Sequence, residues 1–181
     1  MIKPLLHPFS IFSEKKLLFF GIVLTIFSAF LASFFNARRN GVLDVHFVTS
    51  ISFTTALIES LINLFILSIF LFIAGIITNK KTRLIDIFIT ALVALPVFLL
   101  TFFFNINNTM SDLGLQISEL NSNNSIMEIL LDNIFLLLVF ALWSLLVLAW
   151  VFILLYSGFK VASNAKGSKP IFFIYWCNTS S

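Results

Sequence analysis

The sequence predicts an all-α integral membrane protein, a transmembrane helical bundle with four full spans and a short fifth apolar stub. Three observations lead to this prediction. Only 10% of the 181 residues are charged, against roughly 25% in soluble proteins. Four long apolar runs approach or exceed the about 20 residues that a helix needs to cross a bilayer. The basic residues gather in alternate loops, as in chains that cross a membrane repeatedly.

The four runs predict helices over about residues 17–35, 57–79, 85–104 and 134–157 of a single membrane domain that covers residues 1–181. A fifth apolar run, Ile171–Cys177, follows three lysines. It is too short to cross a bilayer as a helix. It begins where an outgoing fifth helix would start, so a truncated fifth helix is favoured over a tail that lies on the membrane surface.

The distribution of Lys and Arg predicts the orientation. Three precede the first span, three lie between the second and third, and three follow the fourth. Only Arg38 and Arg39 fall on the other side. The positive-inside rule therefore places the N-terminus in the cytoplasm. Richness in Phe, Ile and Asn fits an AT-rich bacterial genome, so the expected location is the bacterial inner membrane.

The segments between the spans differ in character. Residues 1–16 are apolar with basic edges and are expected to lie along the cytoplasmic interface. Residues 80–83 predict a tight basic turn, and residues 42–58 an outer loop that runs into the second helix. Residues 105–133 predict a long outer loop. Its second half, "SIMEILLDN", is either an extension of the fourth helix or a short interfacial helix.

Four polar or kinking residues in the spans are candidates for function. Glu59 and Asn63 are four apart, so they share a helix face near the outer end of the second span. An ionisable group in a membrane is a functional candidate, although Glu59 could also be a boundary residue. Asp86 lies beside the basic turn, where an ion pair or a helix N-terminal charge explains it. Pro96 should kink the third span, which occurs on substrate paths and in ordinary spans alike.

Other residues indicate packing and anchoring. Small side chains repeat at a spacing of four in the first span, which allows close helix approach within the bundle or in a dimer. These residues are Ser28, Ala29, Ala32 and Ser33. Trp150 and Tyr156 lie toward the cytoplasmic end of the fourth span and suit an interfacial anchor. Trp143 is deeper and is expected to pack.

The sequence offers little for catalysis or for a cofactor. His7 and His46 fall on opposite sides of the predicted membrane, so they cannot share a metal ion. The single cysteine excludes an internal disulfide and a cysteine metal cluster. Phosphate-binding loops and nucleophile motifs are absent from the sequence. We therefore expect no enzyme activity, no cofactor and no nucleic-acid partner.

Several marks of the layout resemble the bacterial branch of the Yip1 domain family. "HPFSIF" precedes the first span, and a basic hairpin joins the second and third. "WSLLVLAWVFILLYSGFKVASNAKGSKPIFF", which begins at Trp143, runs from the fourth span through a basic loop into the fifth apolar run. The positions that would align are Pro8, Phe12, Trp150, Gly158 and Lys169.

The resemblance implies five helices, a cytoplasmic N-terminus and a non-enzymatic role as a membrane-organising or partner-binding scaffold. Its expected partners are membrane lipids and a membrane protein or a second copy of the chain. The Asp-Leu-Tyr-Gly-Pro-like motif of the eukaryotic branch is missing here, so recruitment of Rab GTPases is not implied. The alternative function is a small transporter or permease subunit, with Glu59, Asn63 and Pro96 along its path.

Overall fold

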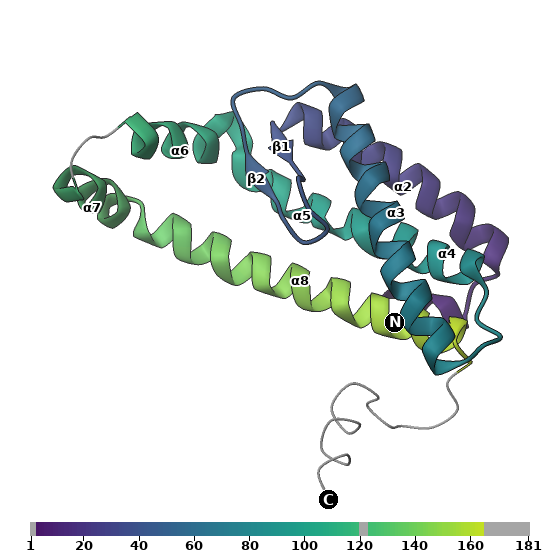
Figure 1. The fold of residues 1–181 in the computed structure, drawn as a ribbon. Coiled ribbons are helices and arrows are strands. Elements are labelled where there is room, and N and C mark those ends of the chain that lie inside the picture. Colours follow the sequence, from purple (N-terminus) through teal and green to yellow (C-terminus); the bar gives the residue numbers. More distant parts are fainter. Residues whose placement is uncertain (1–2, 120–122, 165–181) are drawn as a thin grey trace, which may run out of the picture.

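The computed structural model describes residues 3–119 and 123–164, and this part of the chain is an all-α helical bundle (Figure 1). Four helical stretches are long and apolar enough to cross a membrane: Glu14–Phe34, Phe53–Thr78, Leu84–Glu119 and Ile134–Ala162. The predicted fold class is confirmed, and these stretches make the chain an integral membrane protein. The fifth apolar run, residues 171–177, lies outside the described residues.

The first span is preceded by two short helical segments. Helix α1 (Lys3–Leu6) and the 3-10 turn η1 (Pro8–Ser10) lead into α2 (Glu14–Phe34). Helix α2 starts three residues before the predicted position 17. Ser13 supplies an extended N-cap residue, and the acidic Glu14 suits the positive end of the helix dipole.

The connection between the first and second spans contains a small hairpin. Strand β1 (Ala37–Arg38) pairs antiparallel with β2 (His46–Phe47). Helix α3 (Phe53–Thr78) then begins four residues before the predicted position 57. The Ser52 hydroxyl accepts a hydrogen bond from the Thr55 N–H at 3.1 Å and so caps the helix. Residues 42–58, predicted as a loop that runs into the second helix, therefore include a short strand and the first turns of α3.

The third span is a composite rather than one kinked helix. It runs through α4 (Leu84–Ala94), the 3-10 turn η2 (Leu95–Phe98), α5 (Leu99–Phe102), the 3-10 turn η3 (Phe103–Asn108) and α6 (Thr109–Glu119). Pro96 lies at the start of η2, where its missing N–H interrupts the α-helical hydrogen-bond ladder. The chain leaves helical geometry again at Asn105–Asn107.

Residues 109–119 correct the sequence prediction, because they form helix α6 instead of a loop. The buried Asn105 side chain accounts for the start of this helix. Its Oδ1 accepts hydrogen bonds from the N–H groups of Met110 and Ser111, each at 2.9 Å. These donors belong to the first turn of α6 and would otherwise lack partners.

Helix α7 (Asn123–Asp132) is a separate helix that Asn133 divides from α8 (Ile134–Ala162). Of the two alternatives for this segment, the structure therefore has a distinct short helix and no continuous extension of the fourth span. Helix α8 continues five residues beyond the predicted end at 157. The tight turn predicted at residues 80–83 separates α3 from α4.

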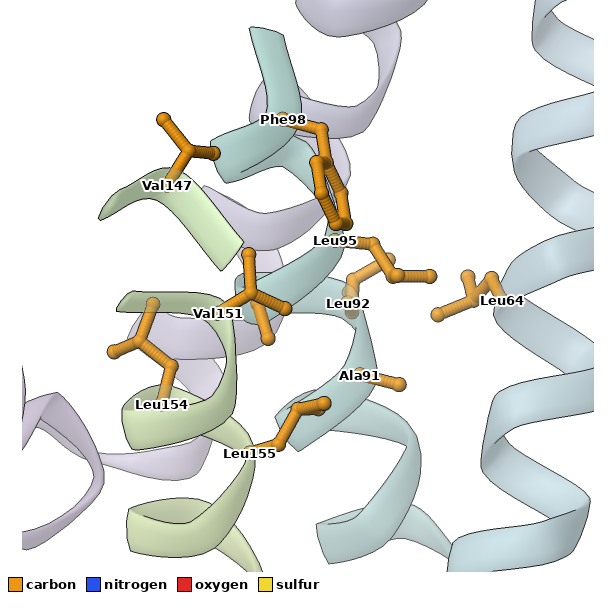
Figure 2. Packing of buried hydrophobic residues seen from close by; sticks show 10 residues of the cluster. Leu64, Ala91, Leu92, Leu95, Phe98, Val147, Val151, Leu154 and Leu155 are labelled. Atoms are coloured by element: carbon orange, nitrogen blue, oxygen red, sulfur yellow. The ribbon is translucent and has the colours of Figure 1, made fainter. Parts of the chain in front are cut away.

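The core lies around α4 and η2, which pack against α2, α3 and α8. Figure 2 shows Leu92, Leu95 and Phe98 between Val151 of α8 and Leu64 of α3. The outward faces of the spans carry large apolar side chains, which suits contact with lipid. Helix α8 is the least buried of the four stretches.

Candidate functional site

The densest polar cluster among the described residues lies where the α2–α3 connection meets α3. We call it the Arg39 cluster, and its members are Arg38, Arg39, Glu59, Ser60 and Asn63. Strand β1 and the residue after it supply the two arginines. Helix α3 supplies the other three, which its 3.6-residue repeat brings to one side.

Arg39 is only 5% exposed, although it is a charged residue. Its Nη2 donates to the Ser60 hydroxyl at 2.6 Å, and its Nη1 donates to the Leu95 carbonyl at 3.1 Å. In a regular α-helix the Leu99 N–H would donate a hydrogen bond to the Leu95 carbonyl. Here the Leu99 N–H donates instead to the carbonyls of Pro96 and Val97. The 3-10 turn at Pro96 thus leaves the Leu95 oxygen available to Arg39.

Burial shifts the pKa of Arg39. Loss of hydration lowers this pKa from the ordinary arginine value to about 10, and the negative charge of Glu59 opposes that shift. The guanidinium therefore remains protonated at neutral pH. A buried cation of this kind is stable only where hydrogen bonds and a nearby anion replace its hydration.

Glu59 and Asn63 form hydrogen bonds with the backbone of Arg39, and Glu59 also pairs with the neighbouring side chain of Arg38. Glu59 Oε1 accepts from Arg38 Nε at 2.7 Å, and Oε2 accepts from the Arg39 N–H at 3.4 Å. Asn63 Nδ2 donates to the Arg39 carbonyl at 2.9 Å. The Glu59 side chain is 14% exposed. The Glu59 carboxylate therefore attaches the α2–α3 connection to α3.

Asp86 lies at the other end of the bundle from the Arg39 cluster. Both of its oxygens accept from Arg83, each at 2.8 Å, and Arg83 also binds Glu14. These hydrogen bonds, to Asp86 first and then to Glu14, raise the pKa of Arg83. The ion triplet connects the start of α2 to the start of α4. It is an exposed interaction of modest energy.

The small residues of the first span face the bundle. Ser28, Ala29 and Ala32 are buried in α2, and the Ser33 hydroxyl donates to the Ile51 carbonyl at 3.1 Å. The Ser28 hydroxyl finds no hydrogen-bond partner within the described part of the chain. The structure places these side chains against other helices of the same bundle and against the α2–α3 connection.

The tryptophans of α8 bond to the backbone of other segments. Trp150 Nε1 donates to the Leu5 carbonyl at 3.1 Å, and His7 Nδ1 lies 3.1 Å from the Ser157 hydroxyl. Trp150 therefore holds the N-terminal segment on α8, while Tyr156 is 65% exposed. Trp143 Nε1 donates to the Leu100 carbonyl at 3.0 Å, which attaches α8 to the irregular third span.

Two neighbouring cavities open near the start of α2. The first, of about 640 Å³, is apolar, and Pro96 lines it together with the N-terminal segment, α2 and α8. The second, of about 620 Å³, has apolar and polar walls, and its charged residues are Glu14, Lys15, Arg83 and Asp86. Glu59 and Asn63 line neither cavity.

Sequence reasoning identified Glu59 and Asn63 but missed Arg38, Arg39 and Ser60. A signal was present, because Arg38 and Arg39 are adjacent and are the only Lys or Arg residues in the sequence of the two connections that follow the first and third predicted spans. Comparisons with protein-family models, with curated proteins and with solved structures find no match for this chain. The class that the fold defines is therefore an all-α integral membrane protein, and its helices alone establish that class.

Proposed function

We propose that this chain is a non-enzymatic membrane protein of the Yip1 type, a scaffold that organises the membrane or binds a partner protein within it. The observation that carries the proposal is that the polar side chains of the Arg39 cluster form hydrogen bonds within the protein itself. Glu59, Asn63 and Arg39 bond to one another or to the backbone of the bundle. A catalyst or a carrier needs such groups free to meet a substrate.

The remaining surface of the spans supports a role in contact with lipids or with other helices. Leu142 and Leu146 of α8 are 63% and 66% exposed, and they are one helical turn apart on the same face. Helices associate in membranes through such packing surfaces. The proposed partners are membrane lipids and either a membrane protein or a second copy of this chain.

The proposal includes a place and an orientation. By the order of the spans in the sequence, nine Lys and Arg residues are expected on the side of the N-terminus and two on the other. Of those two, Arg39 is buried, and Arg38 is paired with Glu59. The positive-inside rule then favours a cytoplasmic N-terminus. The proposed location is the inner membrane of a bacterium.

Site-specific photo-crosslinking in cells tests the scaffold proposal. A photoreactive amino acid at Leu142 or Leu146 should give one discrete adduct with a protein, whose mass identifies a partner or a second copy. The same probe at Val151, which is 0% exposed, is the matched control and should react only within the chain.

Two results would count against the scaffold. One is that both exposed positions yield only lipid adducts. The other is a proton flux through proteoliposomes, followed with an internal pH dye, that the Glu59→Gln variant removes. Such a flux would support the transporter alternative, because Glu59 would then lie on a conduction path.

A further inference from the structure

We propose that the two cavities at the start of α2 form one binding site for an anionic phospholipid. The apolar cavity binds an acyl chain. Lys16, which lines this cavity, and Lys15, which lines the second one, bind the phosphate. The ligand comes from the leaflet on the side of the N-terminus. This inference is independent of the proposed scaffold function, since a transporter could carry the same site.

The shape and lining of the first cavity suit an acyl chain. Its volume of about 640 Å³ lies within the about 300–1,000 Å³ of ligand pockets. Lys16 is the single charged residue among those that line it. The lining residues of α2 extend from Lys16 to Leu24, which is about 12 Å along a helix. The cavity therefore runs from the helix end into the apolar part of the span.

Several segments that are distant in sequence build the cavity walls. Pro8 and Phe12 come from the N-terminal segment, Val97 from the η2 turn, and Trp150 and Leu154 from α8. The hydrogen bond from Trp150 Nε1 to the Leu5 carbonyl holds the N-terminal segment against α8. The proline-induced turn at Pro96 supplies another part of the wall. The cavity therefore forms only when the N-terminal segment, η2 and α8 pack together in the folded protein.

Charge complementarity identifies the class of lipid. Within the described residues, neither Lys15 nor Lys16 has a carboxylate oxygen within 4.0 Å. The nearby carboxylates of Glu14 and Asp86 are both bound to Arg83 instead. Two lysines at the end of a span are thus available to an anion. Lysine stems can follow an apolar surface while the ammonium group reaches the interface, where anionic headgroups attract it.

The second cavity extends the site toward water. Phe12 and Leu17 line both cavities, so the two lie side by side. Lys15, Ser13 and Thr90 line the second cavity together with Arg83 and the two carboxylates bound to it, Glu14 and Asp86. An amphipathic ligand with an apolar chain and a charged, hydrogen-bonding head matches this change from apolar to polar lining. A phospholipid has that chemistry, whereas a free phosphate ion would leave the apolar cavity unexplained.

Quenching of Trp150 fluorescence by brominated lipids tests the site. In a Trp143→Phe, Trp176→Phe background, Trp150 is the sole tryptophan. The protein would be placed in phosphatidylcholine vesicles with increasing fractions of a brominated lipid. This lipid is either brominated phosphatidylglycerol, which is anionic, or brominated phosphatidylcholine, which has no net charge. We expect the anionic lipid to quench Trp150 half-maximally at a several-fold lower mole fraction. Inorganic phosphate should not change this preference.

The matched variants are Lys16→Gln and Lys81→Gln. Lys81 is an exposed lysine of the same end of the bundle and lines neither cavity. Lys16→Gln should weaken the preference for the anionic lipid, since Lys15 alone remains, whereas Lys81→Gln should retain it in full, with unchanged circular dichroism in both. Equal quenching by the two lipids in the parent, or a preference that Lys16→Gln leaves unchanged, overturns the assignment. Loss of the preference on adding inorganic phosphate overturns it as well.

Discussion

At the scale of single residues, the burial of the charged Arg39 side chain carries a large desolvation cost. A charge that leaves water loses its hydration, and the loss is tolerated only with replacement partners. Ser60 and Leu95 provide two hydrogen bonds to the guanidinium, and Glu59 provides an anion nearby. The planar guanidinium suits this role, because its fixed donors reach two acceptors on different helices at once.

We predict that Arg39→Lys destabilises the protein by about 1–3 kcal/mol, because one ammonium group cannot replace the two separated donors. Arg38→Lys is the matched control. Arg38 is 42% exposed and makes a single ion pair, so its loss should cost less than about 1 kcal/mol. Denaturant unfolding in detergent micelles measures both variants. Equal destabilisation by the two substitutions would contradict the role assigned to Arg39.

At the scale of elements, the contact of α4 with α8 depends on a glycine. A Cβ added to Gly158 would lie 2.5 Å from Thr90 Oγ1 and 2.9 Å from Thr90 Cβ. Those distances are too short for non-bonded atoms, so the two helices approach closely only because Gly158 has no side chain. Gly114 of α6, in contrast, has no atom within 4 Å of such a Cβ.

We therefore predict opposite effects of the same substitution at these two glycines. Gly158→Ala should destabilise the protein by about 1–3 kcal/mol, since overpacking forces the helices apart. Gly114→Ala should be neutral or stabilising by up to about 1 kcal/mol, because alanine favours the helix. Thr90→Ala should recover part of the loss in Gly158→Ala, and thermal unfolding measures all three. A Gly158→Ala protein as stable as the parent would show that the helices are free to separate.

At the scale of the whole molecule, the order of spans fixes which segments share a side of the membrane. Helices α2 and α3 are joined by the hairpin at one end, and α3 and α4 by the tight turn at the other. Figure 1 shows α6 and α7 at the end of the bundle opposite the chain termini of the described part. The Arg39 cluster and the Arg83 triplet thus belong to opposite ends.

Reporter fusions after Arg39, Arg83, Asn123 and Lys166 test this arrangement. We expect the fusions at Arg39 and Asn123 to report outside the cytoplasm, and those at Arg83 and Lys166 inside it, because lysines and arginines retain their loops in the cytoplasm. Fluorescent and phosphatase reporters at each position give complementary signals. A cytoplasmic signal after Arg39 would refute the proposed orientation and, with it, the resemblance to the Yip1 family.

A fusion after Ser181 addresses the fifth apolar run. A signal from outside would mean that the run is drawn across the membrane, and a cytoplasmic signal that it lies at the inner surface. Residues 171–177 are fewer than a helix needs to cross a bilayer without local thinning or a partner. The two outcomes therefore separate the truncated helix from the interfacial tail.

The sequence by itself determined the class of protein and the number of full spans. Hydropathy and span length are local properties, and about 20 apolar residues form a helix in a bilayer whatever their neighbours are. The tight turn at residues 80–83 was equally predictable, since the basic run is short. Helix α6 was missed because residues 109–119 mix polar and apolar side chains. Its cap, Asn105, also acts across a stretch of non-helical backbone.

Only the tertiary structure decided how the polar residues are used. Arg39 and Leu95 are 56 positions apart, yet the guanidinium reaches the carbonyl that the Pro96 turn leaves available. The cavity beside Lys16 likewise needs the N-terminal segment, α2 and α8 together. Hydrogen bonds and cavities depend on distances between segments, and a pattern of residue types along one chain does not contain those distances. The packing of the helices sets these distances. It brings the Glu59 carboxylate within hydrogen-bond distance of the Arg38 side chain and the Arg39 backbone.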